Sequence, residues 1–377
     1  EIINNMPDIK INNAQKTETQ KWEENQNRIN NLILKQMTIN YKQNVGRNTM
    51  NRLRDIVIIC YCCIIAIEGN LTVGVLMSIS YILGQLGGPI GQIQSLLTQY
   101  QMFKVSMARL SEVQRKENEQ QGAQEMQIDK FRHEILFSEV SFKYEGSFSP
   151  NIFEGLSISF PANKMTAIVG NSGSGKTTLL KLIMGFYYPQ KGKITIDETP
   201  LNEIDINSWR NCCGVVLQDG KIFSGTITEN ITLGSEIINE KKIETVSKLA
   251  CIDEFIQKQP GKYNMKIGST GIELSQGQKQ RILIARALYK DPQLLIFDEA
   301  TSSLDTVNER RIMDNLKYYF MGRTVIVVAH RLSTVVNADN IIFLENGKIA
   351  EQGTHKTLVA KKGKYYELIK NQLELEN

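Results

Sequence analysis

A glycine-rich stretch near the middle of the chain constrains the fold more than any other feature. Residues 170–178 read Gly-Asn-Ser-Gly-Ser-Gly-Lys-Thr-Thr, after a short apolar run and before a helix-forming segment. This is the G-x-x-x-x-G-K-[ST] pattern, in which backbone N–H groups and a helix start surround a polyphosphate. A simple glycine turn is the alternative, but the order strand, loop, helix favours a phosphate site. The expected nucleotide contacts are Asn171, Ser172, Gly173, Ser174, Gly175, Lys176, Thr177 and Thr178.

Composition excludes several classes of function. The 377 residues are 41% hydrophobic, enough for two domains or for one domain with an appendage. The net charge of +4 comes without a Lys/Arg block, so we expect no nucleic acid partner. Six cysteines without zinc-like spacing indicate reduced thiols. Because Glu1 falls within a polar helical pattern, we expect a fragment of a longer protein.

The first 110 residues change from polar to apolar. Residues 1–50 are polar with a helical stripe, and either a solvated linker helix or a docking element explains them. Residues 56–67 are an unbroken apolar run of twelve, and a second run covers 71–90. A helix needs about 20 apolar residues to cross a bilayer, so only the second run is long enough alone. Arginine and lysine flank both outer ends, which predicts a transmembrane hairpin with cytoplasmic ends rather than a soluble helical pair.

A polar linker at 113–131 leads into a globular pattern. Serines alternate with apolar residues from 156 to 160, as in a half-buried strand. Four continuous apolar runs, at 167–169, 214–217, 294–297 and 324–329, predict buried strands of a parallel sheet. Ligands bind beyond the carboxyl ends of such strands. The residues at those ends are Gly170, Gln218, Asp298 with Glu299, and His330.

These strand-end residues suit phosphate chemistry. Asp298 is expected to hold Mg²⁺ together with the Thr177 hydroxyl, and Glu299 to act as the general base. Helix capping is the alternative role for Asp298. Gln218 is expected to bridge the metal and the attacking water, and His330 to contact the γ-phosphate, although an ordinary loop glutamine and a structural histidine fit the same positions.

Two further stretches are candidate nucleotide contacts. Tyr144 could stack on adenine or serve as a core aromatic residue. Ser275, Gly277 and Gln278 precede an amphipathic helix and form either a second anion-binding helix end or a capping turn. If both phosphate-binding helix ends serve one nucleotide, they come from different subunits.

In this order and spacing the motifs resemble those of ATP-binding-cassette (ABC) transporter ATPases, from about residue 131 onward. Residues 170–178 resemble the Walker A loop, Gln218 the Q-loop, 274–278 the signature, 294–299 Walker B and 302–305 the D-loop. The resemblance implies an α/β P-loop NTPase cassette with a mostly parallel core sheet, an antiparallel β subdomain and a helical subdomain. It also implies ATP and Mg²⁺ as ligands, Asp305 as a nucleotide contact, His330 as the H-loop histidine, and a head-to-tail dimer.

The preceding residues resemble the last part of an exporter membrane domain. The resemblance implies four regions: an intracellular loop at 1–50, two transmembrane helices within 51–112, a linker at 113–131 and the cassette at 132–377. A coupling helix is expected at 13–24, with Trp22 as a docking anchor. The parts at 87–90 and 106–113 are similar to peptidase-containing bacteriocin and peptide exporters, in which an N-terminal cysteine peptidase removes a double-glycine leader.

The expected function is therefore ATP-driven export of a peptide across the cytoplasmic membrane, with the ATPase domain in the cytoplasm. The intact motifs favour a homodimer over pairing with a paralogous half-transporter. A lipid or drug exporter is the alternative, followed by a soluble cassette ATPase of DNA repair or translation and by a module that binds ATP without hydrolysis. Two positions depart from the family pattern: Gln276 replaces a signature glycine, and Ser269 stands where a glutamate is common.

Overall fold

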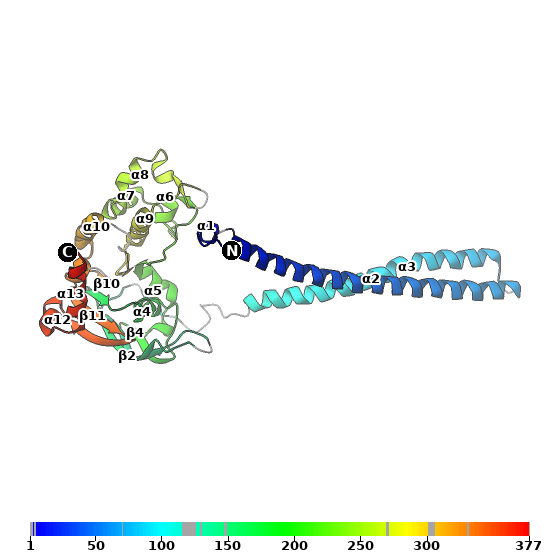
Figure 1. Ribbon diagram of the computed structural model, residues 1–377, viewed down its shortest axis with the longest axis horizontal. Coiled ribbons are helices and arrows are strands. Elements are labelled where there is room, and N and C mark those ends of the chain that lie inside the picture. Colours follow the sequence, from blue (N-terminus) through cyan, green and yellow to red (C-terminus); the bar gives the residue numbers. More distant parts are fainter. Residues whose placement is uncertain are drawn as a thin grey trace. The chain divides into compact units, whose positions relative to one another are not determined.

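The computed structural model describes residues 3, 5–69, 71–114, 126–128, 130–146, 149–268, 271–300, 306–329 and 332–376. The chain divides into two compact units, Glu1–Glu117 and Asn118–Asn377. Both are drawn in Figure 1.

The first unit is helical. Its elements are α1 (Met6–Ile11), α2 (Gln15–Ile67) and α3 (Val73–Gln114). The long helices α2 and α3 lie side by side as a hairpin (Figure 1). The helix α2 ends where the sequence predicted a break, with Glu68 as its cap and Gly69 at a φ of 78°. The segment proposed as a coupling helix, 13–24, begins in the turn after α1 and continues into α2, and Trp22 is exposed.

Apolar side chains cover the outside of the hairpin. On α2 they include Ile56, Val57, Ile59 and Ile64, and on α3 they include Ile82, Leu96 and Leu97, all of them exposed. Among the described residues, the segment Val73–Ser111 is the one helix that is long and apolar enough to cross a membrane by length and composition. An apolar surface of this extent needs a lipid or protein cover in water.

The second unit is built on a six-stranded sheet with the strand order β12-β11-β3-β10-β9-β6. The four runs that the sequence predicted as parallel strands are all in it and are parallel to their neighbours. The strands are β3 (Met165–Val169), β6 (Cys213–Val216), β9 (Leu294–Asp298), β10 (Thr324–Val328), β11 (Asn340–Glu345) and β12 (Lys348–Gly353), of which only β12 runs antiparallel to its neighbour.

A second sheet of order β2-β1-β4-β5 is antiparallel. Its strands are β1 (Glu134–Phe142), β2 (Phe153–Pro161), β4 (Lys191–Ile196) and β5 (Thr199–Pro200). Leu156, Ile158 and Phe160 of β2 are buried while Ser157 between them is exposed, which confirms the predicted alternation. This sheet is the antiparallel β subdomain that the sequence resemblance implied.

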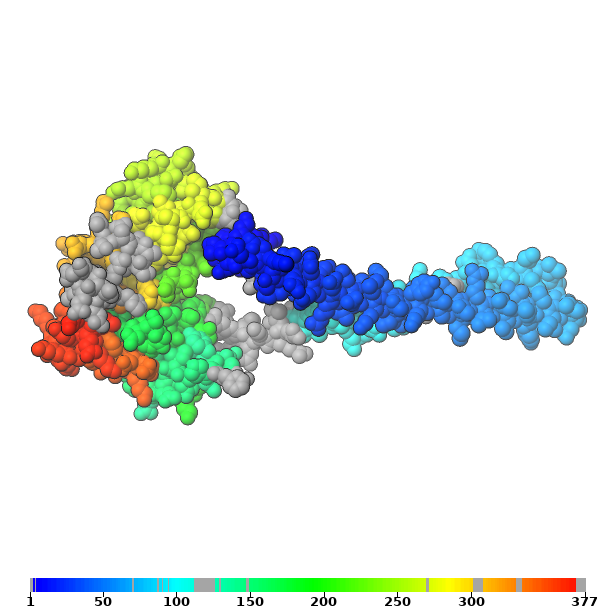
Figure 2. All heavy atoms as spheres, viewed as in Figure 1, coloured from blue at the N-terminus to red at the C-terminus, as the bar shows by residue number. Residues whose placement is uncertain are grey.

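Helices complete the unit. The helical lobe contains α6 (Ile227–Ile231), α7 (Glu240–Leu249), α8 (Asp253–Gln257) and α9 (Gln276–Tyr289), together with the short strands β7 (Gly225–Thr226) and β8 (Lys266–Ile267). In the space-filling view this yellow-green lobe stands at the opposite end of the unit from the antiparallel sheet (Figure 2). The remaining helices are α4 (Lys176–Ile183), α5 (Ile206–Cys212), α10 (Thr306–Tyr319), α11 (Leu332–Val335), α12 (His355–Lys361) and α13 (Lys364–Glu376), with 3₁₀ turns at Leu201–Glu203 and Lys262–Asn264.

Five strands of the six-stranded sheet are mostly buried on both faces, whereas the edge strand β12 is partly exposed. Alternate residues of one strand enter different cores: Leu295 and Phe297 belong to one cluster, while Leu294 and Ile296 belong to the other. The continuous apolar runs of the sequence follow from this double burial. The polar side chains of the candidate site lie at or just beyond the carboxyl ends of these strands.

Candidate nucleotide-binding site

The P-loop joins β3 to α4 and depends on its glycines. The helix α4 begins at Lys176, and the preceding Gly175 has a φ of 104°. A Cβ on Gly175 would lie 2.8 Å from a ring carbon of Phe153, and a Cβ on Gly170 would lie 2.1 Å from the Leu344 carbonyl oxygen. No side chain fits at either position, so the loop backbone stays close to its neighbours and its N–H groups face one space.

Lys176 is buried at the start of α4. Its Nζ donates to the carbonyl oxygens of Gly170 at 2.8 Å and of Asn171 at 2.9 Å. Burial lowers the pKa of Lys176, while the charges of Glu299 and Asp298 act in the opposite direction. An ammonium group has three donors, so one N–H remains for a ligand. Ser174 is also buried, and its hydroxyl has no partner among the described residues, which fits a phosphate oxygen.

Asp298 is the last residue of β9 and is almost fully buried. Burial raises the pKa of Asp298, the nearby Glu299 adds to this, and a hydrogen bond from Thr177 lowers it. Its Oδ1 is buried without a partner among the described residues. A carboxylate oxygen without a partner beside a threonine hydroxyl is a donor set that suits Mg²⁺.

Glu299 follows directly and is held in an uncommon backbone conformation. Its φ is 49°, in the left-handed region that non-glycine residues seldom adopt, and its N–H donates to the Val328 carbonyl. Gln218, beyond the end of β6, donates from Nε2 to Glu299 Oε2 at 3.0 Å. The structure thus brings together two strand ends that lie 81 residues apart in the sequence.

A cavity of about 530 Å³ brings most of these groups together, but Ser174 and Asp298 are not among its lining residues. It is lined by P-loop residues, by both strand-end side chains and by one apolar residue that the sequence reasoning missed: Ser172, Gly173, Gly175, Lys176, Thr177, Thr178, Gln218, Glu299 and Ile152. Ile152 gives no motif signal, because only the packing of the 149–152 loop places it there. The cavity thus holds a P-loop, an amide and a carboxylate together, which are groups that suit polyphosphate chemistry.

Tyr144 lies beside the P-loop rather than within the cavity lining. Its hydroxyl is 3.1 Å from Thr178 Oγ1, and its ring packs edge-on against Phe142 and Tyr187. The side chain is half-buried. Both the core role and the adenine-stacking role that the sequence left open remain compatible with this position.

The second predicted anion-binding end is the start of α9. Ser275 is its N-cap: its Oγ accepts from the Gln278 N–H, and the Gln278 side chain accepts from the Ser275 N–H. Ser275, Gly277 and Gln278 are not among the residues that line the P-loop cavity. Within one chain the structure therefore does not join this helix end to the P-loop.

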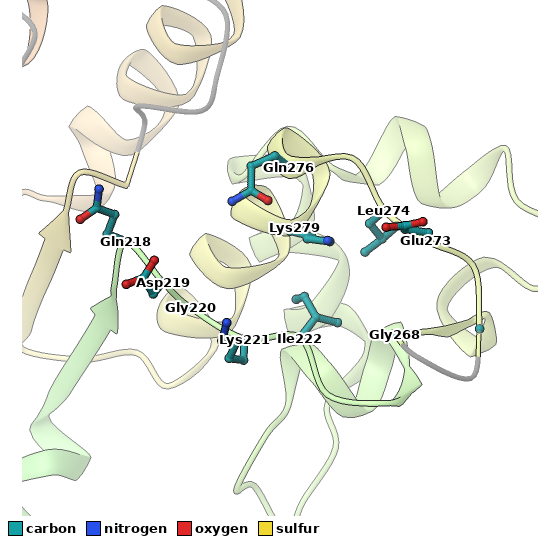
Figure 3. A pocket seen from close by; sticks show the side chains of 11 residues that line it. Gln218, Asp219, Gly220, Lys221, Ile222, Gly268, Glu273, Leu274, Gln276 and Lys279 are labelled. Carbon is teal, nitrogen blue, oxygen red and sulfur yellow. The ribbon is translucent and has the colours of Figure 1, made fainter. Parts of the chain in front are cut away.

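A second cavity, of about 500 Å³, separates Gln218 from the start of α9 (Figure 3). Gln218, Asp219 and Lys221 lie along one side, and Gln276 and Lys279 of α9 along another. Gly268 and Glu273 close it from the β8 side. Three predicted site or coupling residues, His330, Asp305 and Ser269, lie outside the described residues.

Comparison with known proteins gives this geometry a family. The family model described as "ABC transporter" matches residues 153–302, which hold the P-loop, Gln218, the start of α9 and Glu299. The chain carries an ABC transporter ATP-binding domain. Its second unit as a whole has the P-loop NTPase architecture that this family uses, and the helical first unit is part of the match to an ABC exporter fold.

Several relatives extend the similarity beyond the ABC domain. The alpha-hemolysin translocation ATP-binding protein HlyB of Escherichia coli is 40% identical over 302 residues, covering 80% of this chain and 42% of that protein. The toxin RTX-I translocation ATP-binding protein of Actinobacillus pleuropneumoniae is 41% identical over 313 residues, covering 83% of this chain and 44% of that protein. The chain thus spans less than half the length of these curated relatives.

A solved structure described as a bacterial Atm1-family ABC exporter with ATP bound is also similar. It matches with a TM-score of 0.90 and 31% identity, over 98% of this chain and 65% of that one. The match includes the helical unit, so the predicted resemblance to an exporter membrane domain is confirmed at the level of the fold.

Proposed function

We propose that this ABC domain hydrolyses ATP to ADP and phosphate. The observation that carries the proposal is the contact between Gln218 and Glu299 at 3.0 Å, in the same cavity as Lys176 and Thr177. A cassette that only held ATP would need the P-loop but not a carboxylate positioned by a neighbouring amide. Glu299 and Gln218 supply what hydrolysis needs in addition to binding.

Each residue has a role in the proposed reaction. The P-loop N–H groups and Lys176 bind the β- and γ-phosphates. Glu299 accepts the proton of a water molecule whose oxygen attacks the γ-phosphorus, and Gln218 orients that water and the carboxylate. The bond from the γ-phosphorus to the bridging oxygen breaks, and its electron pair leaves with ADP. Tyr144 stacks on adenine and His330 contacts the γ-phosphate.

Mg²⁺ fits the residues present. Thr177 and Asp298 would hold it, with the Gln218 side-chain oxygen as a further ligand, and Asp298 Oδ1 has no other partner among the described residues. When bound, the ion neutralises charge on the phosphate oxygens.

The active site is proposed to form between two copies of the chain. Ser275, Gly277 and Gln278 would contact a nucleotide held by the partner's P-loop, together with Asp305. The position of Ser275, Gly277 and Gln278 outside the P-loop cavity of their own chain supports this arrangement. A homodimer is favoured over a paralogous half-transporter, because one chain carries every motif that both halves need.

The proposed work of hydrolysis is export across the cytoplasmic membrane. The residue ranges 51–112 and 132–377 would be membrane helices and cassette, joined by a linker at 113–131, and 1–50 would carry the coupling helix. The exposed apolar side chains of α2 and α3 support contact with lipid or with further membrane helices. The names of two relatives concern translocation of toxins, so a polypeptide is the favoured cargo, including a bacteriocin-like peptide. A lipid or drug is the alternative cargo.

ATP turnover by the purified chain in lipid vesicles tests the proposal. Glu299→Gln keeps the size of the side chain but cannot accept a proton, so turnover should fall by about 10²–10⁴-fold with ATP still bound in a stable dimer. Glu240→Gln, at the exposed start of α7, is the matched control and should retain full turnover. Undiminished turnover in Glu299→Gln would remove this residue from the base role. Stimulation of turnover by lipids or dyes but not by leader-bearing peptides would favour the alternative cargo.

A further inference from the structure

The segment that follows Gln218 is packed directly on α9. At Gly220 a Cβ would lie 2.5 Å from Leu283 Cδ1, so the backbone there runs against the surface of α9. Gly220 is only two residues from Gln218. The position of Gln218 is therefore tied, through two residues of backbone, to a helix whose other end carries the signature.

Arg286 strengthens this attachment one turn further along α9. Its Nη1 donates to the Lys221 carbonyl at 3.0 Å. Its Nε donates to the Asn230 carbonyl at 2.7 Å, and its Nη2 to Asn230 Oδ1 at 2.9 Å. The guanidinium carbon lies 5.6 Å from the centre of the Phe223 ring. Leu283 and Arg286 are three residues apart and so share one helix face.

Asn230 of α6 bonds the same segment, and we call this pair of residues the Arg286–Asn230 clamp. Asn230 is 1% exposed. Its Oδ1 accepts from the Phe223 N–H at 2.9 Å, and its Nδ2 donates to the carbonyls of Phe223 at 2.9 Å and of Thr226 at 3.0 Å. A buried side chain with this many partners is costly to displace. The Arg286–Asn230 clamp thus joins residues 221–226 and α9 into one body.

The two sides of this body face the same cavity (Figure 3). Gln218 to Ile222 line one side, and Gln276 and Lys279 of α9 line another. Along a helix, ten residues separate Gln276 from Arg286, a rise of about 15 Å. A displacement of the start of α9 is therefore passed by the helix to the clamp, and by the clamp to Gln218.

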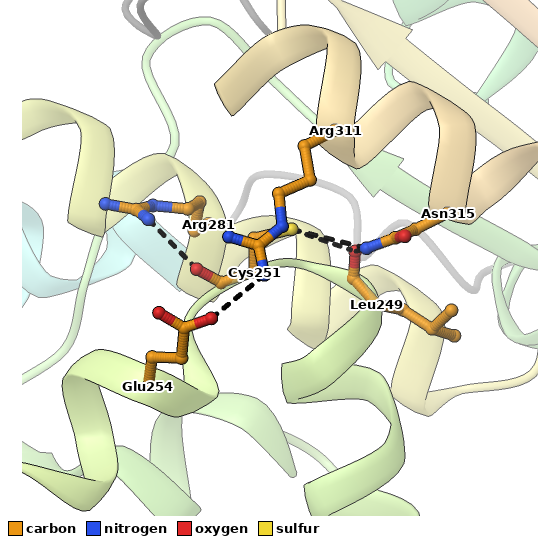
Figure 4. Close-up of polar contacts among 6 residues, drawn as sticks. All are labelled: Leu249, Cys251, Glu254, Arg281, Arg311 and Asn315. Carbon is orange, nitrogen blue, oxygen red and sulfur yellow. Dashed lines mark hydrogen bonds and ion pairs between the residues drawn. The ribbon is translucent and has the colours of Figure 1, made fainter. Parts of the chain in front are cut away.

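A second arginine holds α9 on its other side, within the helical lobe (Figure 4). Arg281 donates to the Cys251 carbonyl at 2.9 Å, and Asn315 of α10 donates to the Leu249 carbonyl at 3.4 Å and to Cys251 Sγ at 3.3 Å. Arg281 thus joins α9 to the end of α7, whereas Arg286 joins α9 to the segment after Gln218. The two arginines therefore attach α9 to different parts of the chain, and each attachment can be removed without the other.

We infer that Arg286 is a positioning residue for hydrolysis. Because Arg286 and Asn230 hold the segment after Gln218 on α9, the hydrogen bond from Gln218 to Glu299 depends on where α9 lies. The inference rests on the proposed ATPase function. It assigns to a residue outside the P-loop cavity a control over catalysis that leaves nucleotide binding unchanged.

The test compares Arg286→Ala with Arg323→Ala in the full chain. Arg323 is a matched control, because it makes a similar number of contacts elsewhere, with a carboxylate in place of the amide. Its guanidinium donates to the carbonyls of Pro292 and Tyr319 and to Asp291, and stacks on the Tyr319 ring at 4.0 Å. Four quantities are measured for each variant: the Tm, the nucleotide Kd, the kcat for ATP, and amide hydrogen exchange at 219–226.

Both substitutions should lower the Tm. Arg286→Ala alone should reduce kcat by about tenfold or more, at an ATP Kd within about twofold of wild type, and should speed exchange at 219–226. Gly220→Ala should move the same segment away from Leu283 while leaving Arg286 in place, and should therefore lower kcat in the same way. This second variant provides the test if Arg286→Ala does not fold. Equal kcat losses in Arg286→Ala and Arg323→Ala, or an unchanged kcat in both Arg286→Ala and Gly220→Ala, would overturn the inference.

Failure of the proposed function gives a different result. A wild-type chain that binds ATP without turnover contradicts the ATPase proposal. The hydrogen-exchange measurement then still tests whether the clamp couples residues 219–226 to α9. In that case, nucleotide binding to the wild-type chain should change the amide hydrogen-exchange rates of 219–226 and of the start of α9 in parallel. In Arg286→Ala the rates of the two segments should change independently. Independent changes in the wild-type chain would then refute the clamp itself.

Discussion

Gln218 Nε2 donates a 3.0 Å hydrogen bond to Glu299 Oε2, and so links the end of β6 to the end of β9. The two strands are neighbours in the sheet, which is why residues so distant in sequence meet. The contact restrains a carboxylate whose backbone is already in the left-handed region. Strain at a reacting group, held by its surroundings, is a common feature of active sites.

Removal of the Gln218 amide should therefore affect turnover more than binding. A hydrogen bond to a charged group contributes about 1.5–3 kcal/mol, so Gln218→Ala should lower kcat by about 10- to 100-fold. The KM for ATP should change little, because Lys176, the P-loop and the two proposed main Mg²⁺ ligands, Thr177 and Asp298, are intact. Gln352→Ala on β12, which removes an amide bonded to Asn340, is the control in the same steady-state assay. A rise in KM with unchanged kcat would place Gln218 in binding instead.

Tyr144 offers a test of nucleobase recognition. Tyr144→Ala should weaken ATP binding by about tenfold through loss of the stacking surface, while Tyr144→Phe, which loses only the contact with Thr178, should stay within about threefold. Titration calorimetry with ATP and with inorganic tripolyphosphate separates the two terms. Equal losses for both ligands in Tyr144→Ala would show that the ring supports the P-loop rather than the base.

The sequence was sufficient to predict the parallel core strands, and eight of the nine residues that line the P-loop cavity were among its candidates. Runs such as 294–297 are apolar because both sheet faces are covered, and the residues after them are polar because chemistry occurs at strand ends. The hairpin break at Glu68 was equally readable, since charge and glycine interrupt a long apolar pattern.

Other features depend on contacts that no local pattern encodes. Ile152 enters the cavity only because its loop packs beside the P-loop. Arg286 and Asn230 are 56 residues apart, and each looks like an ordinary helix residue until the fold places them together. The pairing of β11 with β3 likewise depends on tertiary packing and is not encoded in the β11 sequence alone.

Asp291 should make part of the stability of the cassette dependent on pH. Partial burial opposes its charged form, but the hydrogen bond and charge of Arg323, with the Tyr319 hydroxyl, outweigh burial, so the pKa of Asp291 lies below its ordinary value. A lowered pKa contributes stability above the unfolded-state value of 3.8, which is lost as the pH falls through the folded-state value.

Asp291→Asn should thus lower stability at pH 7 and lose its effect at acid pH. Because the Asp291 side chain is 56% exposed, solvent screening limits the difference to about 1 kcal/mol or less. Thermal unfolding between pH 7 and pH 3 measures it, with Asp314→Asn, an exposed carboxylate on α10, as the control. A difference between Asp291→Asn and wild type that persists unchanged at the lowest pH would show that charge is not its source.

Gly170 and Gly173 form a matched pair within the P-loop. Both have a positive φ, 150° and 79°, but a Cβ at Gly170 would meet the Leu344 carbonyl oxygen at 2.1 Å, whereas nothing lies within 4 Å of a Cβ at Gly173. Gly173→Ala should cost only the backbone strain, about 1–2 kcal/mol. Gly170→Ala adds a collision with the backbone of β11, which cannot move without disturbing the sheet, so its cost should exceed about 3 kcal/mol. Denaturant unfolding without nucleotide measures the free energy of unfolding of both variants. Equal losses would mean that β11 moves to admit the added methyl group, and Gly170 would then not be required for the close approach of the P-loop to the sheet.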